Sequence, residues 1–205
     1  MYKSFTKRLL DVVLSGIGII VLALPMLIIA LIIKIDSPGK VFFKQERVGL
    51  HKKNFKILKF RSMRSDTPRD VPTHALQGAN SYITKFGAWM RKMSVDELPQ
   101  IFCIFMGTMS IIGPRPALYN QEDLIAERDK YGANDVKPGL TGLAQIRGRD
   151  ELPIEVKAAL DGEYVKKMSF LFDVKIFFGT ILNVLRSDGI VEGAQEAEKE
   201  KEAVK

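Results

Sequence analysis

The sequence is poor in the residues that usually hold metals or cross-link small domains. Among its 205 residues there is one cysteine, Cys103, and there are two histidines, His51 and His74. A single cysteine cannot form an internal disulfide, and its position in the apolar run IFCIF is typical of a small buried side chain in a reducing compartment. No cysteines and histidines are spaced as in a zinc site. A disulfide scaffold and a structural zinc protein are therefore excluded.

The sequence also lacks internal repeats and the common nucleotide-binding fingerprints. The glycine-rich stretch PGLTGLAQIRGR at residues 138–149 matches neither a P-loop nor a Rossmann motif. Its arginines, Arg147 and Arg149, are nevertheless candidate phosphate ligands, because glycine-rich loops can approach a phosphate closely. The length of the chain predicts one globular domain plus an appendage.

Acidic residues are fewer than basic ones. The chain has 31 lysines and arginines against 24 aspartates and glutamates, which gives a formal charge of +7 and an isoelectric point near 9.4. This excess favours anionic partners, which include nucleic acid, an anionic membrane surface and phosphorylated substrates. Charge alone does not choose among them.

One long segment lacks charge altogether. Residues 12–33 form a run of 22 uncharged, mostly apolar residues. As a helix this run would reach about 33 Å, enough to cross a hydrocarbon core of about 30 Å. A cleavable signal peptide fits poorly, because the run is longer than a typical h-region and no small-x-small cleavage site follows it. The segment is therefore expected to enter a membrane.

Pro25 divides this apolar run, and the flanking charges do not say which end would lie outside. Proline cannot donate a backbone hydrogen bond, so the helix is expected to kink there. Lys7 and Arg8 stand before the run and Lys34 stands after it, so the bias of basic residues toward the cytoplasm gives no orientation. A re-entrant helix that enters and leaves by one face and a kinked single span are both consistent with these residues.

The remainder predicts a mixed α/β fold that is mostly helical, with one small β-hairpin. Residues 40–61 alternate in polarity around a basic turn, which predicts two antiparallel strands. Lys59 and Arg61 are two residues apart and are expected on one face of the second strand. Apolar side chains at helical spacing predict helices over residues 83–92 and 170–185, and the charged stretch 120–131 is expected to be a surface helix that ends at Gly132. The helix over residues 170–185 fits either the core or a membrane interface.

Two further segments have little to bury. Residues 65–79 form a polar loop with two prolines, long enough to be functional or mobile. The tail at residues 189–205 is dominated by glutamate, lysine and alanine, and is expected to be disordered.

The stretch SVDELPQIF at residues 94–102 places two carboxylates side by side, just after a cationic pair that includes Arg91. Ser94 and Glu97 have the spacing of a capping box, although a helix starting at Asp96 is an alternative register because of Pro99. In both registers Asp96 lies at a helix N-terminus, where the dipole keeps a carboxylate ionised and attracts phosphate. An ordinary solvated helix end would have the same two residues.

Arg115 lies between two prolines in the sequence GPRP. This framing holds its backbone extended, and its guanidinium can bind a carboxylate or a phosphate with two parallel hydrogen bonds. A structural ion pair and a phosphate site are both open for this residue.

Taken together, six stretches resemble the bacterial monotopic phosphoglycosyl transferases, which are polyprenyl-phosphate sugar-1-phosphate transferases. The resemblance rests on KRLLD at 7–11, the proline-broken apolar run, KFRSM at 59–63, RKMSVDELPQ at 91–100, MSIIGPRPAL at 109–118 and KPGLTGLAQIRGRDEL at 137–152. Their order and spacing extend over nearly the whole chain before the tail.

The resemblance implies a reaction and its residues. A sugar 1-phosphate would pass from a UDP-sugar to undecaprenyl phosphate through a covalent intermediate, with Asp96 as nucleophile and ligand of Mg²⁺, and Glu97 as its partner. The expected phosphate ligands are Lys59, Arg61, Arg91, Arg115, Arg147 and Arg149. Pro25 would form the kink of a re-entrant membrane helix, and Lys7, Arg8 and Asp11 would anchor it.

The resemblance also implies an organisation. Residues 1–36 would form the re-entrant helix and residues 37–188 one catalytic domain with interfacial helices, on the cytoplasmic face of the bacterial plasma membrane. The partners would be the UDP-sugar, the polyprenyl phosphate and the bilayer, without nucleic acid. The sugar, the glycan pathway and the oligomeric state, a homodimer included, stay open.

Two other classes of function compete with this one. A membrane-tethered basic module could bind nucleic acid or anionic lipid without turnover, and it would be indifferent to Asp96→Asn. A structural membrane protein would be indifferent to Arg115→Ala, but little besides the apolar run supports it.

Overall fold

A computed structural model of the chain describes residues 2–68, 78–148 and 152–186. Arg149, most of the predicted loop at 65–79 and the predicted disordered tail at 189–205 lie outside the described residues. The described elements, in chain order, are the π-helical turn Tyr2–Thr6, α1 Lys7–Asp36, β1 Phe42–Val48, the 3₁₀ turn Leu50–Lys52, β2 Asn54–Phe60, α2 Ala79–Tyr82, α3 Lys85–Lys92, the 3₁₀ turn Val95–Glu97, α4 Gln100–Met106, β3 Ser110–Ile112, α5 Glu122–Asp129, the 3₁₀ turn Ala133–Asp135, β4 Gly139–Thr141, α6 Leu143–Ile146, α7 Ile154–Lys167 and α8 Phe170–Arg186.

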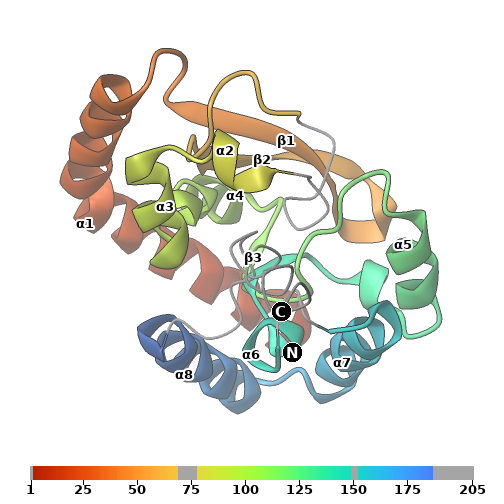
Figure 1. The fold of residues 1–205 in the computed structure, drawn as a ribbon. Helices are drawn as coiled ribbons and strands as arrows, with labels where there is room; N and C mark the ends of the chain where they lie inside the picture. Colours follow the sequence, from red (N-terminus) through yellow and green to blue (C-terminus); the bar gives the residue numbers. More distant parts are fainter. Residues whose placement is uncertain (1, 69–77, 149–151, 187–205) are drawn as a thin grey trace.

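Helix α1 is the longest element and runs along one side of the molecule (Figure 1). It is long and apolar enough to cross a membrane, and Pro25 lies inside this single helix. One face packs on the domain, where Met26, Ile29 and Ile33 join Phe60 of β2 and Met90 of α3 in a core cluster. The other face leaves large apolar side chains exposed, among them Ile17, Ile20, Val21, Leu24, Leu27, Leu31 and Ile35.

The predicted hairpin is confirmed. Strands β1 and β2 pair antiparallel, with Phe42 opposite Phe60 and Val48 opposite Asn54. The tip of the hairpin is a tight turn in which His51 and Lys52 have positive φ angles. On the domain side, Ile57 of β2 packs with Cys103 and Ile104 of α4, so Cys103 is buried as predicted.

A second, parallel pair of strands, β3 and β4, was not predicted from the sequence. Each strand has only three residues, and Ser110 lies opposite Gly139 while Ile112 lies opposite Thr141. Helices α6, α7 and α8 pack around this pair, with Tyr164 and Ile176 fully buried beside Ile112. The parallel pair places the glycine-containing stretch PGLTG beside β3, and the sequence GPRP follows directly after β3.

Helix α8 has one buried and one exposed apolar face. Asp173 and Ile176 are buried in the domain. The exposed face has the side chains of Phe170, Leu171, Phe177, Phe178, Ile181, Leu182 and Leu185. One face of this helix is therefore in the core, and the other is uncovered in the described part of the chain.

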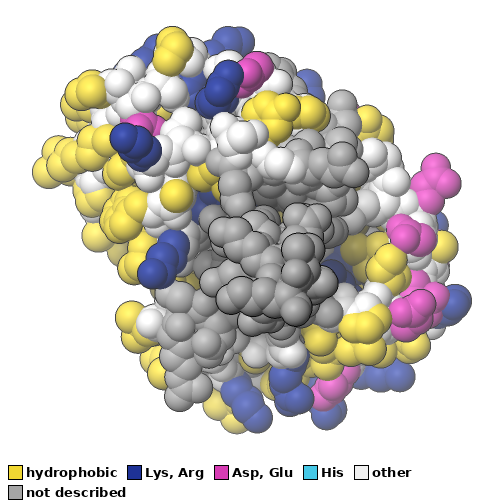
Figure 2. All heavy atoms as spheres, in the orientation of Figure 1, with side chains coloured by type: hydrophobic (Ala, Val, Ile, Leu, Met, Phe, Trp, Pro, Cys, Tyr) yellow, Lys and Arg dark blue, Asp and Glu magenta, His cyan; other side chains and the backbone are white. Residues whose placement is uncertain are grey.

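Charge is distributed unevenly over the surface. In the view of Figure 2, hydrophobic side chains gather on the left, over α1 and α3, whereas acidic side chains gather on the right, over α5. Among the exposed acidic residues of α5 are Glu122 and Asp123. The face opposite α1 is thus the more acidic one.

Candidate active site

The two adjacent carboxylates lie in a 3₁₀ turn, Val95–Glu97, directly before α4. The predicted capping box is wrong, because Ser94 takes the left-handed conformation with a φ of 54° and its side chain caps nothing. Pro99 precedes the first residue of α4, where its missing N–H removes no helical hydrogen bond. The acids therefore stand at the N-terminal end of a helical run, but in a tighter turn than either predicted register.

Glu97 is held by two cations from different elements. Lys59 of β2 donates from Nζ to Oε1 at 2.7 Å. Arg115 donates from Nη2 to Oε1 at 2.6 Å and from Nη1 to Oε2 at 3.3 Å. The hairpin, the turn before α4 and the segment after β3 thus meet at one carboxylate.

The two acids have opposite electrostatic environments. Burial of Glu97 opposes its ionisation, but Arg115 and Lys59 outweigh this effect and hold its pKa well below the usual range. Burial of Asp96 raises its pKa, and the nearby negative charge of Glu97 adds to this effect, while Lys59, Arg91 and Arg115 only partly oppose it. The low pKa of Glu97 therefore comes from its two cations, whereas burial makes ionisation of Asp96 less favourable than in water.

Three of the six predicted phosphate ligands come together at this pair. Lys59 and Arg115 bind Glu97 directly. Arg91, in the last turn of α3, is close enough for its charge to lower the pKa of Asp96. The side chain of Arg115 is 42% exposed.

Arg61 is placed elsewhere. Strand β2 ends at Phe60, and the Arg61 side chain is buried where α1 ends. Its guanidinium donates to the carbonyl oxygens of Ile33, Ser37 and Pro38, and to the Ser37 hydroxyl. These contacts tie Arg61 to the last turn of α1 and to the backbone that follows it. The structure does not bring Arg61 together with Lys59 at the carboxylates.

In the described part of the chain, Arg147 forms no ion pair with either carboxylate. It follows α6, its side chain is exposed, and its charge acts on Glu163 of α7. Arg149 lies outside the described residues. Within the glycine-rich stretch, strand β4 pairs with β3, the strand that precedes Arg115.

Comparison with known proteins gives the family. A family described as bacterial sugar transferase matches residues 2–187. The chain belongs to this bacterial sugar transferase family.

Relatives support the same assignment over most of the sugar transferase chain. An exopolysaccharide production protein, PSS, from Rhizobium leguminosarum bv. phaseoli is 41% identical over 87% of this chain and 94% of its own length. A sugar transferase called EpsL from Bacillus subtilis is 44% identical over 77% of this chain and 75% of its own. A UDP-glucose:undecaprenyl-phosphate glucose-1-phosphate transferase from Escherichia coli is 40% identical over 85% of this chain and 39% of its own. The chain is accordingly an enzyme, a sugar phosphotransferase.

The three side chains predicted to anchor α1 in the membrane instead bind other elements of the sugar transferase. Lys7 pairs with Asp173 of α8 at 2.5 Å. Arg8 donates to the carbonyl oxygens of Ile104 and Phe105 at the end of α4. The buried carboxylate of Asp11 accepts a hydrogen bond from the backbone N–H of Ile111 in β3 at 3.0 Å. These side chains fasten α1 to the domain.

Sequence reasoning missed several residues of this region. Asp173 also accepts hydrogen bonds from the hydroxyls of Tyr2 and Tyr164, at 2.6 and 2.9 Å. Gln100 is buried one turn after Asp96, and in the described part of the chain its side-chain nitrogen has no hydrogen-bond partner. The position of Gln100 in DELPQ was a usable signal, whereas no local pattern pairs Asp173 with the N-terminus.

Proposed function

We propose that this sugar transferase moves a sugar 1-phosphate from a UDP-sugar to a polyprenyl phosphate through an intermediate covalently bound to Asp96. The reaction class is supported by the relatives whose names give this transfer. The roles of individual residues are argued below from the geometry.

The observation that carries the proposal is the division between the two carboxylates. Glu97 is fixed by Lys59 and Arg115, so it is poorly placed to attack a substrate. Asp96 is buried beside it and is not stabilised as an anion to the same extent. Neighbouring acids whose environments separate their pKa values usually have different roles in catalysis. Asp96 is accordingly the nucleophile, and Glu97 positions the two cations.

The chemistry proceeds in two displacements. A carboxylate oxygen of Asp96 attacks the phosphorus that bears the sugar, and the bond from this phosphorus to the bridging oxygen breaks, which releases UMP. The resulting acyl phosphate retains much of the leaving ability of the broken anhydride. An oxygen of the polyprenyl phosphate then attacks the same phosphorus and frees the Asp96 carboxylate.

The cations near the acids make the first attack possible. A carboxylate and a diphosphate repel each other, so positive charge has to be in place before the reacting atoms can approach. Arg115 is partly exposed and can contact the diphosphate while it holds Glu97. Arg91 and Lys59 act on Asp96 from other sides.

The donor set fits Mg²⁺. Within the described residues there is no group of three or more side chains that could hold a metal by themselves. Mg²⁺ commonly binds to one or two carboxylates and completes its shell with substrate phosphates and water. Asp96 would hold Mg²⁺ together with the diphosphate, and the ion would neutralise charge on the transferred group.

The contacts at both ends of α1 support a re-entrant topology. At the N-terminal end Arg8 and Asp11 bind α4 and β3, and at the C-terminal end Ile33 and Ser37 bind Arg61. A helix of 30 residues is about 45 Å long. One domain cannot hold both ends of a helix that crosses the bilayer, so both ends lie on one side. UDP-sugars are cytosolic, which supports a position of the domain on the cytoplasmic face of the plasma membrane.

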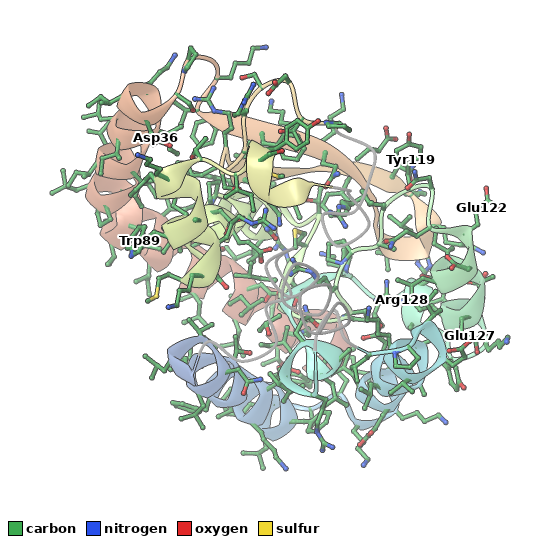
Figure 3. All side chains as sticks on the ribbon, viewed as in Figure 1. Asp36, Trp89, Tyr119, Glu122, Glu127 and Arg128 are labelled. Carbon is green, nitrogen blue, oxygen red and sulfur yellow. The ribbon has the colours of Figure 1, made fainter. Side chains whose placement is uncertain are left out.

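Exposed apolar faces support the same orientation. Trp89 of α3 is half exposed, and it lies near the α1 side of the molecule in Figure 3, together with Asp36 at the end of α1. The apolar face of α8 is also uncovered in the described part of the chain. We propose that α1, α3 and α8 contact the lipid interface, while α5 faces the cytosol.

The first experiment measures UMP release from a panel of UDP-sugars with undecaprenyl phosphate and Mg²⁺. Asp96→Asn is expected to lower the rate at least a thousandfold, roughly the size of effect seen when an essential catalytic group is removed. Glu122→Gln, on α5 at the opposite edge (Figure 3), removes one carboxylate far from the site and should leave the rate unchanged.

A second measurement tests the intermediate itself. Wild-type protein incubated with donor labelled in the sugar phosphate, without lipid acceptor, should become labelled at Asp96. Label on another side chain, or healthy turnover by the Asp96→Asn protein, would overturn the assignment.

A further inference from the structure

Arg47 is an arginine of β1 with no role in the chemistry proposed above. It is the next-to-last residue of the strand, and its guanidinium donates from Nη1 to the backbone carbonyl oxygen of Pro116 at 3.1 Å. The side chain of Gln45, two residues earlier on β1, accepts from Nε and Nη2 of Arg47 through Oε1, at 3.1 and 2.6 Å. Arg47 thus connects the hairpin to the segment GPRP, which contains Arg115.

The backbone on either side of Arg115 can be held in only a few ways. Pro114 and Pro116 flank it, and proline has no backbone N–H to donate. The carbonyl oxygens of the two prolines are therefore the backbone groups through which these flanking residues can be held, and both are bound. The N–H of Gly139 in β4 donates to Pro114 at 2.9 Å, and Arg47 donates to Pro116. Arg115 is thus held by β4 on one side and by the hairpin on the other.

The two attachments differ in kind. On the β4 side they are bonds between backbones, because β3 pairs with β4 just before Arg115. On the hairpin side, the backbone bond runs from the N–H of Val48 to the carbonyl oxygen of Ala117, two residues after Arg115. The carbonyl of Pro116, directly next to Arg115, is bound by the side chain of Arg47. A single substitution can therefore remove this hydrogen bond and leave the backbone bonds in place.

The same hairpin also holds the carboxylate that Arg115 binds. Phe43 lies opposite Lys59 in the antiparallel pair, so their side chains are on one face of the hairpin. Arg47 is four residues after Phe43 on β1 and is on this face as well. Lys59 donates to Glu97 at 2.7 Å, and Arg115 donates to the same carboxylate at 2.6 Å. One face of the hairpin thus fixes the carboxylate through Lys59 and the backbone beside Arg115 through Arg47.

We propose that Arg47 is a positioning residue for the sugar phosphate transfer, which acts through the Pro116 carbonyl on the backbone that presents Arg115 to Glu97 and to the donor diphosphate. This role rests on the proposed function, from which the contact between Arg115 and the diphosphate is taken. Arg47 acts indirectly, since its bond is to the Pro116 backbone. Gln45 orients the guanidinium so that Nη1 meets this carbonyl.

The first test is steady-state UMP release by the full chain in neutral detergent. Arg47→Met keeps an unbranched side chain and removes the guanidinium. Its kcat should fall roughly 10- to 100-fold, with a change in KM of less than about threefold, because a small displacement of a positioned group costs this much in rate. Lys44→Met removes one cation from an exposed position on the opposite face of β1 and should behave as the wild type. Thermal unfolding in the same detergent confirms that the compared proteins are folded.

A double-mutant cycle with Arg115→Ala distinguishes positioning from a role in folding alone. If Arg47 acts through Arg115, Arg47→Met should lower the rate less than about twofold once Arg115 is absent, because residues that act through one another are not additive. Single turnovers with labelled donor and excess enzyme keep the slow Arg115→Ala protein measurable. An equal loss in both backgrounds, or an unchanged rate in Arg47→Met alone, would overturn the proposal.

Variants of Gln45 test the proposal with Arg47 itself in place. Gln45→Met removes the acceptor that orients the guanidinium, and its kcat should fall in the same direction as that of Arg47→Met. Gln45→Glu should retain the wild-type kcat, since a carboxylate also accepts from Nε and Nη2. Equal losses in the two variants would contradict a role for this hydrogen bond in catalysis.

The outcome is separable from that of the proposed reaction. Turnover by Asp96→Asn, or label on another side chain, would overturn the proposed mechanism. Non-additivity between Arg47 and Arg115 is measured from UMP release and does not depend on which side chain is the nucleophile. Label at Asp96 together with an additive cycle would overturn the role of Arg47 alone.

Discussion

At the scale of single residues, two adjacent acids differ because of what their neighbours do. Glu97 accepts hydrogen bonds from two cations, Lys59 and Arg115. Asp96 is buried, and the cations near it offset the cost of burying its charge only in part. Their opposite pKa shifts lead to opposite expectations for stability. An acid whose pKa is raised on folding stabilises the fold only at low pH, and one whose pKa is lowered stabilises it only above its unfolded pKa.

Asp96→Asn should therefore raise the thermal stability at neutral pH, where the buried carboxylate is unfavourable. Each unit by which the pKa is raised corresponds to about 1.4 kcal/mol. The gain should vanish as the pH falls below the unfolded pKa of aspartate, since the carboxyl is then protonated in both states. Calorimetry in detergent at neutral and acid pH checks this, and a loss of stability at neutral pH would contradict it.

Glu97→Gln should lower the thermal stability at neutral pH. At neutral pH it leaves Lys59 and Arg115 without their anion, at an expected cost of about 1–3 kcal/mol. The cost should shrink as the pH falls toward the lowered pKa of Glu97. The same calorimetric series measures both variants, so each is the matched control of the other.

The sequence predicted the two acids and the cations near them, but not the opposite pKa shifts of Asp96 and Glu97. DELPQ and GPRP were recognisable as motifs, and Lys59, Arg91 and Arg115 do meet at the carboxylates. Burial of Asp96 depends on packing between segments far apart in the chain. The capping-box pattern failed because Ser94 takes a left-handed backbone conformation, which sequence spacing does not reveal.

At the scale of elements, the junction between α1 and β1 depends on Arg61. Sequence spacing placed Arg61 beside Lys59, but β2 ends one residue earlier and the chain turns. Gly39 is required here, since it has a φ of +128° and a Cβ would lie 2.1 Å from the Arg61 guanidinium. The alternation of polarity in the sequence predicted strand β2 but could not predict the residue at which it ends.

Arg61→Lys tests this assignment. A lysine ammonium cannot replace the guanidinium contacts with Ile33, Ser37 and Pro38, so stability should fall by about 2 kcal/mol. The KM for the UDP-sugar should change little. Steady-state kinetics together with thermal unfolding measure both quantities. A raised KM with unchanged stability would instead favour the phosphate-ligand role predicted from the sequence.

At the scale of the whole molecule, the sequence predicted the mostly helical fold, the hairpin and the apolar N-terminal helix. It left the topology of that helix open, because basic residues flank it on both sides. The partners of Lys7, Arg8 and Asp11 lie about a hundred or more residues away along the chain. Such long-range contacts have no local signature, yet they carry the argument for a re-entrant helix.

The topology can be measured with single cysteines in a Cys103→Ser background. Lys3→Cys and Lys40→Cys place exposed thiols before and after α1, and Lys53→Cys marks the hairpin. All three should react with a membrane-impermeant maleimide only when the cytoplasmic face is accessible, as in inverted vesicles. Reaction of Lys3→Cys from outside intact cells, with Lys40→Cys protected, would show a spanning helix.

The hydrogen bonds from Arg8 to the C-terminal end of α4 have a consequence for how the lipid acceptor reaches the site. Helix α4 has seven residues and is about 10 Å long, and α1 packs along it, with Gly16 near Phe105 and Gly18 near Ile101. Under the proposed topology, this packing fixes the height of Asp96, in the turn before α4, relative to the hydrocarbon. A polyprenyl phosphate diffusing in two dimensions within its leaflet would then meet the acyl phosphate without being extracted from the bilayer.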